Sequence, residues 1–228
     1  MKKIIIITGA NRGLGKALAD IALKDENTII ISLSRSLNAE HKDISDNKLI
    51  FIKTDLSNSF SDSTLEIIRQ KTHSGDVVYF FNNASIILPI DKIGNFKELD
   101  IEKSIKVNVQ NPVNLINFLL SHFSKNKTIL VNISSGAGYN PIQFWSLYGA
   151  SKAYMKLFFK VLEEENKENR YISIYSIDHG VLDTGMQEVI RDNIFPSQDY
   201  FKFLKENNKL INPEDAALSI FNEINYYE

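Results

Sequence analysis

Short aliphatic runs that alternate with longer amphipathic stretches constrain the fold of this chain more than any other feature of its sequence. The runs consist mostly of isoleucine, leucine, valine and phenylalanine, and they lie at residues 4–7, 28–33, 49–53, 77–81, 128–133 and 172–177. Continuous apolar runs of this length are typical of strands buried on both faces of a parallel sheet. The stretches between them that have the length and pattern of helices are about 14–24, 61–72, 100–123 and 146–165.

This alternation predicts an α/β fold, a doubly wound parallel sheet with helices on both faces, in one domain of residues 1–228. A last helix is expected to begin near Pro213 and run toward Asn225, because proline and acidic residues favour the first turn of a helix. No aliphatic run follows that helix. We therefore expect six strands, with a seventh that is short or missing.

The composition excludes several classes of protein. The chain has no cysteine, which excludes disulfides and thiolate catalysis and fits a reducing compartment such as the cytoplasm. Its net charge is −2 without a long charged block, so neither nucleic acid nor a membrane surface is an expected partner. No stretch approaches the roughly 20 apolar residues that cross a membrane. We expect no metal site, because the histidines are scattered: His41, His73, His122 and His179.

A glycine-rich turn, T-G-A-N-R-G-L-G at residues 8–15, directly follows the first aliphatic run. Gly9, Gly13 and Gly15 would let the main chain turn sharply and approach a pyrophosphate, whose charge then lies at the N-terminus of the next helix. Glycines alone are weak evidence. A strand before them and a helix after them, however, indicate a dinucleotide site.

The end of the second aliphatic run bears on which dinucleotide binds. An acidic residue there would accept the ribose 2′-hydroxyl of NAD, but this chain has Ser34 and Arg35. Together with Arg12 in the glycine turn, these residues suit a 2′-phosphate, because arginine binds phosphate through two hydrogen bonds. NADP(H) is therefore the predicted cofactor. The alternative is that Arg35 is only a solvated loop residue.

Tyr148 and Lys152 begin and end the stretch Y-G-A-S-K, and Ser135 precedes the tyrosine by 13 residues. On a helix, Tyr148 and Lys152 would share one face. A phenol has a pKa of about 10, so it needs a nearby cation to shuttle protons near neutral pH. Ser135 ends a predicted strand, where its hydroxyl could hold a substrate carbonyl. Together the three residues predict an enzyme.

These motifs resemble those of the short-chain dehydrogenase/reductase family over nearly the whole chain, which implies a Rossmann-type fold. The glycine turn resembles the family's cofactor turn, Asp55-Leu56 its adenine contact, and Asn83-Ala84 part of its N-N-A-G motif. The cofactor-binding residues that follow from the turn, the second strand and this resemblance are Gly9, Asn11, Arg12, Gly13, Leu14, Gly15, Ser34, Arg35, Asp55, Leu56, Asn83, Ala84, Tyr148, Lys152, Val181 and Thr184.

The resemblance also implies catalytic roles. Tyr148 would donate a proton, Lys152 would tune the tyrosine and bind the nicotinamide ribose, and Ser135 would orient the carbonyl. Asn108, in K-V-N-V, would hold a proton-relay water.

Within the family, two stretches are most similar to the sepiapterin reductase/benzil reductase branch, S-S-G-A-G-Y-N-P-I-Q-F-W-S-L-Y and G-V-L-D-T-G-M-Q-E-V-I-R. This similarity implies reduction of diketones or aromatic ketones with NADPH. The predicted substrate contacts are Ser135, Tyr139, Trp145 and Met186, although any one of the aromatic residues could instead belong to the core or an interface. We expect residues 183–212 either to cover the pocket or to form a packed surface insertion.

Two positions depart from the family's pattern. Ser85 replaces the glycine of N-N-A-G, next to the cofactor turn. His179 stands where the family usually has the proline of a Pro-Gly pair, and the loss of proline frees a loop near the nicotinamide. His179 is either a pH-sensitive contact or a histidine tolerated in a loop.

The sequence thus predicts an NADPH-dependent carbonyl reductase that acts on a small ketone or diketone. Two alternatives remain open, a catalytically weak dinucleotide-sensing protein and a 3-oxoacyl-carrier reductase. The resemblance also implies a homodimer or homotetramer, paired through the helices at 100–123 and 146–165.

Overall fold

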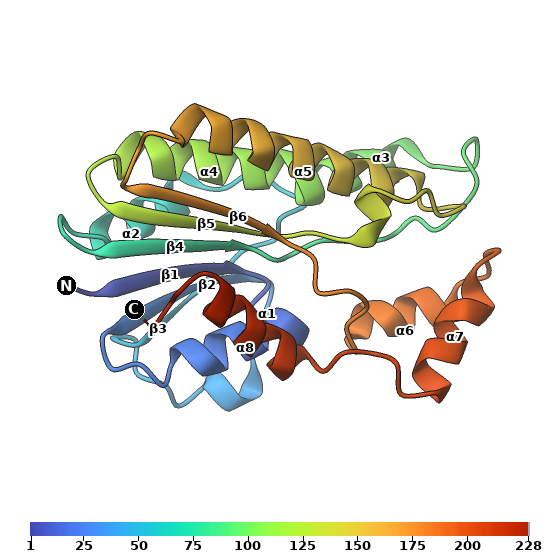
Figure 1. Cartoon of the computed structure of the whole chain (residues 1–228), viewed down its shortest axis with the longest axis horizontal. Coiled ribbons are helices and arrows are strands. Elements are labelled where there is room, and N and C mark those ends of the chain that lie inside the picture. Colours follow the sequence, from blue (N-terminus) through green and yellow to red (C-terminus); the bar gives the residue numbers. More distant parts are fainter. Residues whose placement is uncertain (228) are drawn as a thin grey trace.

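Six parallel strands form the central sheet of the computed structural model, which describes residues 1–227 (Figure 1). The strands are β1 (Lys3–Thr8), β2 (Thr28–Ser34), β3 (Leu49–Lys53), β4 (Val77–Asn82), β5 (Lys127–Ile133) and β6 (Ile172–Ile177). Their order in the sheet is β3-β2-β1-β4-β5-β6, and every neighbouring pair is parallel. The predicted doubly wound parallel sheet of six strands is confirmed.

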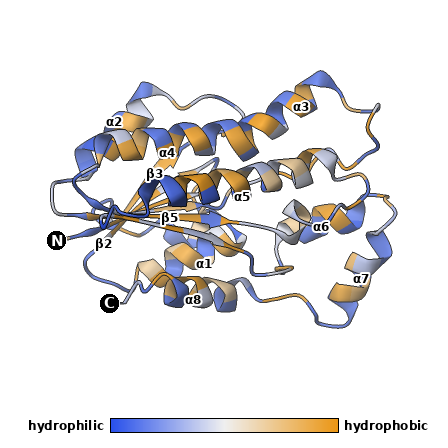
Figure 2. Ribbon diagram, turned by 45° about the horizontal axis from the view of Figure 1, so that its top comes forward, coloured by the Kyte–Doolittle hydropathy of each residue, from blue (hydrophilic) through white to orange (hydrophobic). Residues whose placement is uncertain are grey.

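Different helices cover the two faces of the sheet, because successive side chains of a strand point to opposite sides. In β1, Ile5 and Ile7 pack with helices α1 (Gly13–Ala22) and α8 (Pro213–Glu223). Ile4 and Ile6 pack on the other face with α2 (Asp62–Lys71), α4 (Asn111–His122) and α5 (Ser146–Asn166). Figure 2 shows the matching pattern in the helices, where hydrophobic and hydrophilic residues alternate around each axis.

The helix expected at 100–123 consists of two helices joined end to end. α3 (Glu98–Ile105) continues through a π-helical turn (Lys106–Gln110) into α4. Such turns shift the register of a helix and occur frequently at functional sites. In the part of the chain that the structure describes, no helix is long and apolar enough to cross a membrane.

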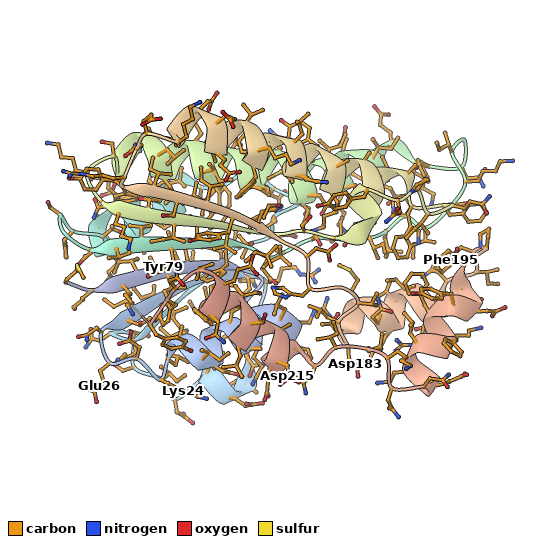
Figure 3. All side chains as sticks on the ribbon, in the orientation of Figure 1. Lys24, Glu26, Tyr79, Asp183, Phe195 and Asp215 are labelled. Carbon is orange, nitrogen blue, oxygen red and sulfur yellow. The ribbon has the colours of Figure 1, made fainter. Side chains whose placement is uncertain are left out.

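Two short helices, α6 (Gly185–Asp192) and α7 (Gln198–Glu206), form a segment that projects beyond the carboxyl ends of the strands (Figure 1). Its two ends are held together, because Asp183 N–H donates to the Ile211 carbonyl at 2.8 Å and Ile211 N–H to the Val181 carbonyl at 2.9 Å. Figure 3 labels Asp183 near the base of this segment and Phe195 between its two helices. We call residues 183–211 the α6–α7 segment.

After α8 the chain returns to the core instead of adding a strand beside β6. Tyr226 is buried, its hydroxyl shares a hydrogen bond of 2.7 Å with Thr28, and its carbonyl accepts from Lys3 Nζ at 2.8 Å. Among residues 1–227, therefore, the sheet has six strands, and β6 and β3 form its two edges.

Candidate active site

The sheet reverses its winding between β1 and β4, and the loops that follow these two strands open a crevice at their carboxyl ends. Ligands of doubly wound sheets bind at such a switch point. A cavity of about 460 Å³ lies there. Its lining includes residues from the glycine turn, the ends of β2, β4 and β5, the start of α5 and the α6–α7 segment.

The glycine turn has the conformation that its sequence predicts. Gly9 and Gly13 have φ angles of +74° and +54°, a region that residues with a Cβ rarely adopt. A Cβ on Gly15 would overlap the carbonyl oxygen of Gly9, so only glycine lets α1 approach the end of β1 this closely. Arg12 precedes α1 without capping it by a side-chain hydrogen bond. The first N–H groups of α1 are therefore available to a phosphate, and the turn fits a dinucleotide.

Thr8 and Asn83 join this turn to the end of β4. The Thr8 hydroxyl accepts hydrogen bonds from the main-chain N–H groups of Asn83 and Ala84, both at 3.1 Å. The Asn83 side-chain amide donates to the Thr8 carbonyl at 2.8 Å. These bonds fix the N-N-A stretch beside the glycine turn, so both face the same cavity.

The predicted 2′-phosphate residues occupy different environments. Arg35 is exposed at the rim of the cavity, whereas Ser34 is buried and its hydroxyl bonds with Ser32 at 3.0 Å and donates to the Ser36 carbonyl at 3.2 Å. The Arg12 guanidinium lies beside Gly185, at the start of α6. Arg35 is therefore the predicted residue best placed for a phosphate at the end of β2.

Asp55 and Leu56 line the same end of the cavity, together with Lys103 from α3. Hydrogen bonds from the main-chain N–H and hydroxyl of Ser57 lower the pKa of Asp55, and the nearby charges of Arg35 and Lys103 lower it further. Asp55 is thus ionised near neutral pH. Lys103 was not predicted, because a lysine on a helix gives no signal of its own in the sequence.

Tyr148 and Lys152 lie one turn apart on α5, and both are buried at the inner end of the cavity. Lys152 Nζ donates to the Ile133 carbonyl at 2.8 Å and lies 5.7 Å from the centre of the Tyr148 ring. Burial lowers the pKa of Lys152 to about 8, while the Asp178 carboxylate acts in the opposite direction. The lysine is therefore held where a modest change in its surroundings alters its protonation.

Burial raises the pKa of Tyr148, so the phenol carries its proton near neutral pH, as a proton donor must. Hydrogen bonding to the hydroxyls of Ser135 and Ser85 lowers the pKa of Tyr148, in part offsetting burial. Ser135 accepts from Ala137 N–H at 3.2 Å, which leaves its own proton available to a carbonyl oxygen.

Asn108 lies in the π-helical turn, buried behind the cavity and not in its lining. Its Oδ1 accepts from Ile86 N–H at 2.9 Å, and its Nδ2 donates to the Ile86 carbonyl at 2.8 Å and to Ser151 Oγ at 3.2 Å. The side-chain amide is thus fully engaged with protein. A relay water near Asn108 would have to bind to other atoms of the turn.

The substrate side of the cavity is aromatic. Trp145 is stacked on Phe201 with ring centres 5.1 Å apart, lies 5.7 Å from Phe195, and meets Tyr148 edge-on at 5.8 Å. Met186 of α6 packs against the same cluster. The predicted contacts Trp145 and Met186 therefore lie where a substrate beside Tyr148 would lie.

The structure places Tyr139 elsewhere, in contrast to the prediction. Tyr139 follows a short 3-10 turn (Gly136–Gly138) and is exposed, and Lys156 Nζ lies 2.8 Å from the centre of its ring. It borders a separate surface groove. All the other predicted cofactor and substrate residues line the cavity, as does Ser85.

His179 also lies outside the cavity lining. Burial lowers the pKa of His179, while the negative charges of Glu223 on α8 and of Asp178 raise it. Its neighbour Asp178 does line the cavity, with Oδ1 accepting from Gly180 N–H at 2.9 Å. The carboxylate of Asp178 acts on Lys152 and raises its pKa, a contact that no sequence motif predicted.

The doubly wound parallel sheet has a glycine turn at its switch point, and a buried Tyr–Lys pair lies beside a serine at the end of a strand. This combination defines an oxidoreductase that uses a nicotinamide dinucleotide. The chain belongs to the short chain dehydrogenase family, whose model matches residues 3–194. A curated relative, the benzil reductase ((S)-benzoin forming) of Bacillus cereus, is 33% identical over 96% of this chain and 93% of its own length. The solved KRED1-Pglu enzyme has a TM-score of 0.82 at 27% identity, covering 95% of this chain and 92% of that chain.

Two other solved structures contain bound dinucleotides. ElxO with NADP bound is 26% identical, with a TM-score of 0.77, and the match covers 97% of this chain and 90% of that chain. A 4-hydroxyisoleucine dehydrogenase complexed with NADH is 26% identical, with a TM-score of 0.81, over 98% of this chain and 91% of that chain. The choice between NADP and NAD therefore depends on this chain's own residues.

Proposed function

We propose that the protein is an NADPH-dependent carbonyl reductase that acts on a ketone or diketone. The observation that carries this proposal is the buried Tyr148–Lys152 pair, which lies beside Ser135 at the inner end of a cavity with an aromatic wall. A proton donor, a carbonyl-binding hydroxyl and an apolar pocket are what carbonyl reduction requires. The similarity to a benzil reductase supports the same substrate class.

NADP(H) is the cofactor that the residues at the end of β2 favour. Arg35 lies at the cavity rim in the position where an NAD-specific site would have a carboxylate, and Asn11 donates to the nearby Ser36 hydroxyl at 3.1 Å. Val181 and Thr184 line the cavity beyond the glycine turn and would contact the nicotinamide. The bound cofactor supplies the hydride.

The residues of the chain would hold the substrate and move the proton. Ser135 orients the carbonyl oxygen, and Tyr148 donates its proton to that oxygen as the negative charge develops. Lys152 binds the nicotinamide ribose, and its positive charge favours the phenolate that remains after proton transfer. Asn108 fixes the main chain beside Ser85, close to the tyrosine hydroxyl.

The α6–α7 segment would cover the substrate. Phe195 and Phe201 pack on Trp145, so the segment contacts the start of α5 through an apolar surface. Exclusion of water by such a cover strengthens the interactions of the reacting groups.

A homo-oligomer would form through the outer face of α3 and α5. Ile105, Tyr154, Leu157 and Val161 are exposed there, at 47–64% of their full area. Four large apolar side chains on adjoining helices form the kind of patch that a second copy covers. Light scattering after size exclusion will distinguish a dimer from a tetramer. A cytoplasmic location stays a prediction from the sequence.

The test is NADPH oxidation with a panel of ketones that includes benzil, in parallel with NADH and with the Tyr148→Phe variant. We expect turnover that prefers NADPH and falls at least 100-fold in the variant, since positioned acid–base groups contribute about 10²–10⁴-fold. NADPH binding without turnover of any ketone would reject the reductase and favour a dinucleotide-sensing protein. Turnover confined to 3-oxoacyl thioesters would favour a 3-oxoacyl-carrier reductase.

A further inference from the structure

Two asparagine side chains hold the loop between β2 and β3 against the glycine turn. Asn11, in that turn, donates to the Ser36 hydroxyl at 3.1 Å, and Asn38 Nδ2 donates to the Asn11 carbonyl at 2.9 Å. The Ser34 hydroxyl donates to the Ser36 carbonyl at 3.2 Å. The residues on both sides of Arg35 are therefore fixed by hydrogen bonds.

The same loop is joined to helix α1 by a buried imidazole. His41, in a 3-10 turn (Ala39–His41), is 3% exposed, and its Nε2 lies 2.7 Å from Asp20 Oδ1 on α1. Lys16 Nζ, also on α1, lies 2.7 Å from Asp20 Oδ2 and 2.9 Å from Glu40 Oε2. Two side chains of the helix thus contact two side chains of the loop.

Hydrogen bonds set the charges of this cluster. Burial raises the pKa of Asp20, but hydrogen bonds from Lys16 and His41 outweigh burial and lower it. Hydrogen bonds to Asp20 and Glu40 raise the pKa of Lys16, so Asp20 and Lys16 are both charged near neutral pH. An ionised carboxylate can only accept, so His41 Nε2 donates the hydrogen bond. Removal of charged groups from water offsets much of their attraction, so stability alone does not explain such a cluster.

Helix α1 and the loop after β2 would each bind a different phosphate group of one NADP(H) molecule. The free N–H groups at the start of α1 suit the pyrophosphate, and Arg35 at the cavity rim suits the 2′-phosphate. NAD(H) has the pyrophosphate but lacks the 2′-phosphate. The distance between helix and loop therefore matters for the binding of NADP(H) and much less for that of NAD(H).

We propose that His41 and Asp20 are positioning residues for cofactor selectivity, because their contact holds the loop that contains Arg35 at the distance from α1 that NADP(H) requires. This proposal rests on the proposed function, since it explains how the same site distinguishes NADPH from NADH. Neither side chain lines the cavity, so both act through Arg35. A loop that already has its bound geometry favours binding, because no free energy is lost in ordering it.

The test measures dissociation constants for NADPH and NADH by the fluorescence of the nicotinamide. His41→Leu removes the imidazole N–H, whereas His41→Gln keeps an N–H donor near the position of Nε2. We expect His41→Leu to weaken NADPH binding about 5-fold and NADH binding less than about 2-fold, and His41→Gln to bind both cofactors as wild type does. His73→Leu, at an exposed position before β4, is the control and should change neither constant.

A double-mutant cycle shows whether His41 acts through Arg35. In the Arg35→Ala background, His41→Leu should change the dissociation constant for NADPH less than about 2-fold, because the side chain that it positions is absent. Asn38→Ala is a second, milder variant, since Asn38 is half-buried and its loss removes the hydrogen bond to the Asn11 carbonyl. It should also weaken the binding of NADPH and not of NADH, which tests the proposal even if His41→Leu does not fold.

Three outcomes would overturn the proposal. Equal losses for NADPH and NADH would mean that the cluster serves the fold alone. A loss from His41→Leu that is equally large with and without Arg35 would show that His41 does not act through it. Unchanged NADPH binding in both the His41→Leu and Asn38→Ala variants would exclude a positioning role. A wild-type protein that binds NADH as tightly as NADPH would instead reject the proposed cofactor itself.

Discussion

The side-chain amide of Asn108 forms hydrogen bonds with both main-chain polar groups of Ile86. It accepts from the Ile86 N–H at 2.9 Å and donates to the Ile86 carbonyl at 2.8 Å. Thr8 holds the N–H groups of Asn83 and Ala84 on the other side. Ser85 lies between these fixed points, so the position of its hydroxyl beside Tyr148 is determined by residues from β1 and the π-helical turn. The π-helical turn thus supports the active site from behind.

Asn108→Ala is expected to destabilise the protein and to lower kcat. The substitution removes the side-chain partners of the N–H and carbonyl of the half-buried Ile86, at a cost of about 0.5–1.5 kcal/mol for each hydrogen bond. For a chain of this length, 1 kcal/mol corresponds to a decrease in Tm of about 2–4 °C. Thermal unfolding followed by circular dichroism will measure the decrease. Asn114→Ala, at an exposed position of α4, is the control, and an equal Tm for both variants would contradict the prediction.

Ser85→Ala is expected to move the alkaline limb of the pH profile of kcat/KM to higher pH. Hydrogen bonding to Ser85 lowers the pKa of Tyr148, so its removal lets burial raise that pKa further. The tyrosine then keeps its proton to a higher pH, and reduction continues there. Ser85→Thr keeps a hydroxyl and should keep the wild-type profile. An alanine profile that coincides with wild type would show that Ser85 does not act on the tyrosine.

Lys152→Met is expected to abolish reduction and yet to stabilise the fold at pH 7. Burial lowers the pKa of Lys152 from 10.5 to about 8, so the unfolded chain binds the lysine proton more tightly than the folded protein. Below pH 8 this difference between the folded and unfolded pKa of Lys152 destabilises the folded state by about 3 kcal/mol, since each pKa unit corresponds to about 1.4 kcal/mol. The cost declines as the pH rises from about 8 to 10.5.

Urea unfolding at several pH values will measure that effect. The variant should exceed wild type in free energy of unfolding by up to about 3 kcal/mol at pH 7, less the cost of leaving the Ile133 carbonyl unpaired. The difference in free energy of unfolding between the variant and wild type should become smaller at alkaline pH. A difference that does not change with pH would show that Lys152 is not buried as described.

Arg35→Ala is expected to reduce the preference for NADPH over NADH. A hydrogen bond between arginine and a phosphate is worth about 1.5–3 kcal/mol, so KM for NADPH should rise about 10-fold or more while KM for NADH stays unchanged. Steady-state kinetics with each cofactor provide the measurement. Arg170→Ala, at an exposed position before β6, serves as the control. Equal losses with both cofactors would assign Arg35 a structural role instead.

Sequence patterns predicted most of the residues that line the cavity, because many of these residues directly follow strands. Gly9, Ser135 and Asn83 each lie just after a buried aliphatic run, and the carboxyl ends of parallel strands necessarily meet at one edge of the sheet. Tyr148 and Lys152 share a helix face through their four-residue spacing. Local periodicity is therefore enough to place these residues in one cavity.

Other features depended on contacts between segments that are distant in the chain. Tyr139 is only four residues from Ser135, yet one short turn directs it to solvent and to Lys156. Gln187 and Asp178 have no distinguishing motif, and they reach the cavity because the α6–α7 segment and the loop after β6 pass over the strand ends. The engagement of Asn108 with Ile86 likewise appears only when the loop after β4 and the π-helical turn lie side by side.

The parallel sheet, the glycine turn and the grouping of Ser135, Tyr148 and Lys152 could all be predicted from sequence, because strand burial, helix periodicity and a turn that only glycine can adopt are local properties. Contacts made only in the tertiary structure set the protonation of Tyr148 and Lys152 and the pairing of Asn108 with Ile86. The physical reason is that pKa values and hydrogen-bond satisfaction depend on burial and on neighbours, and folding assembles those neighbours from the whole chain.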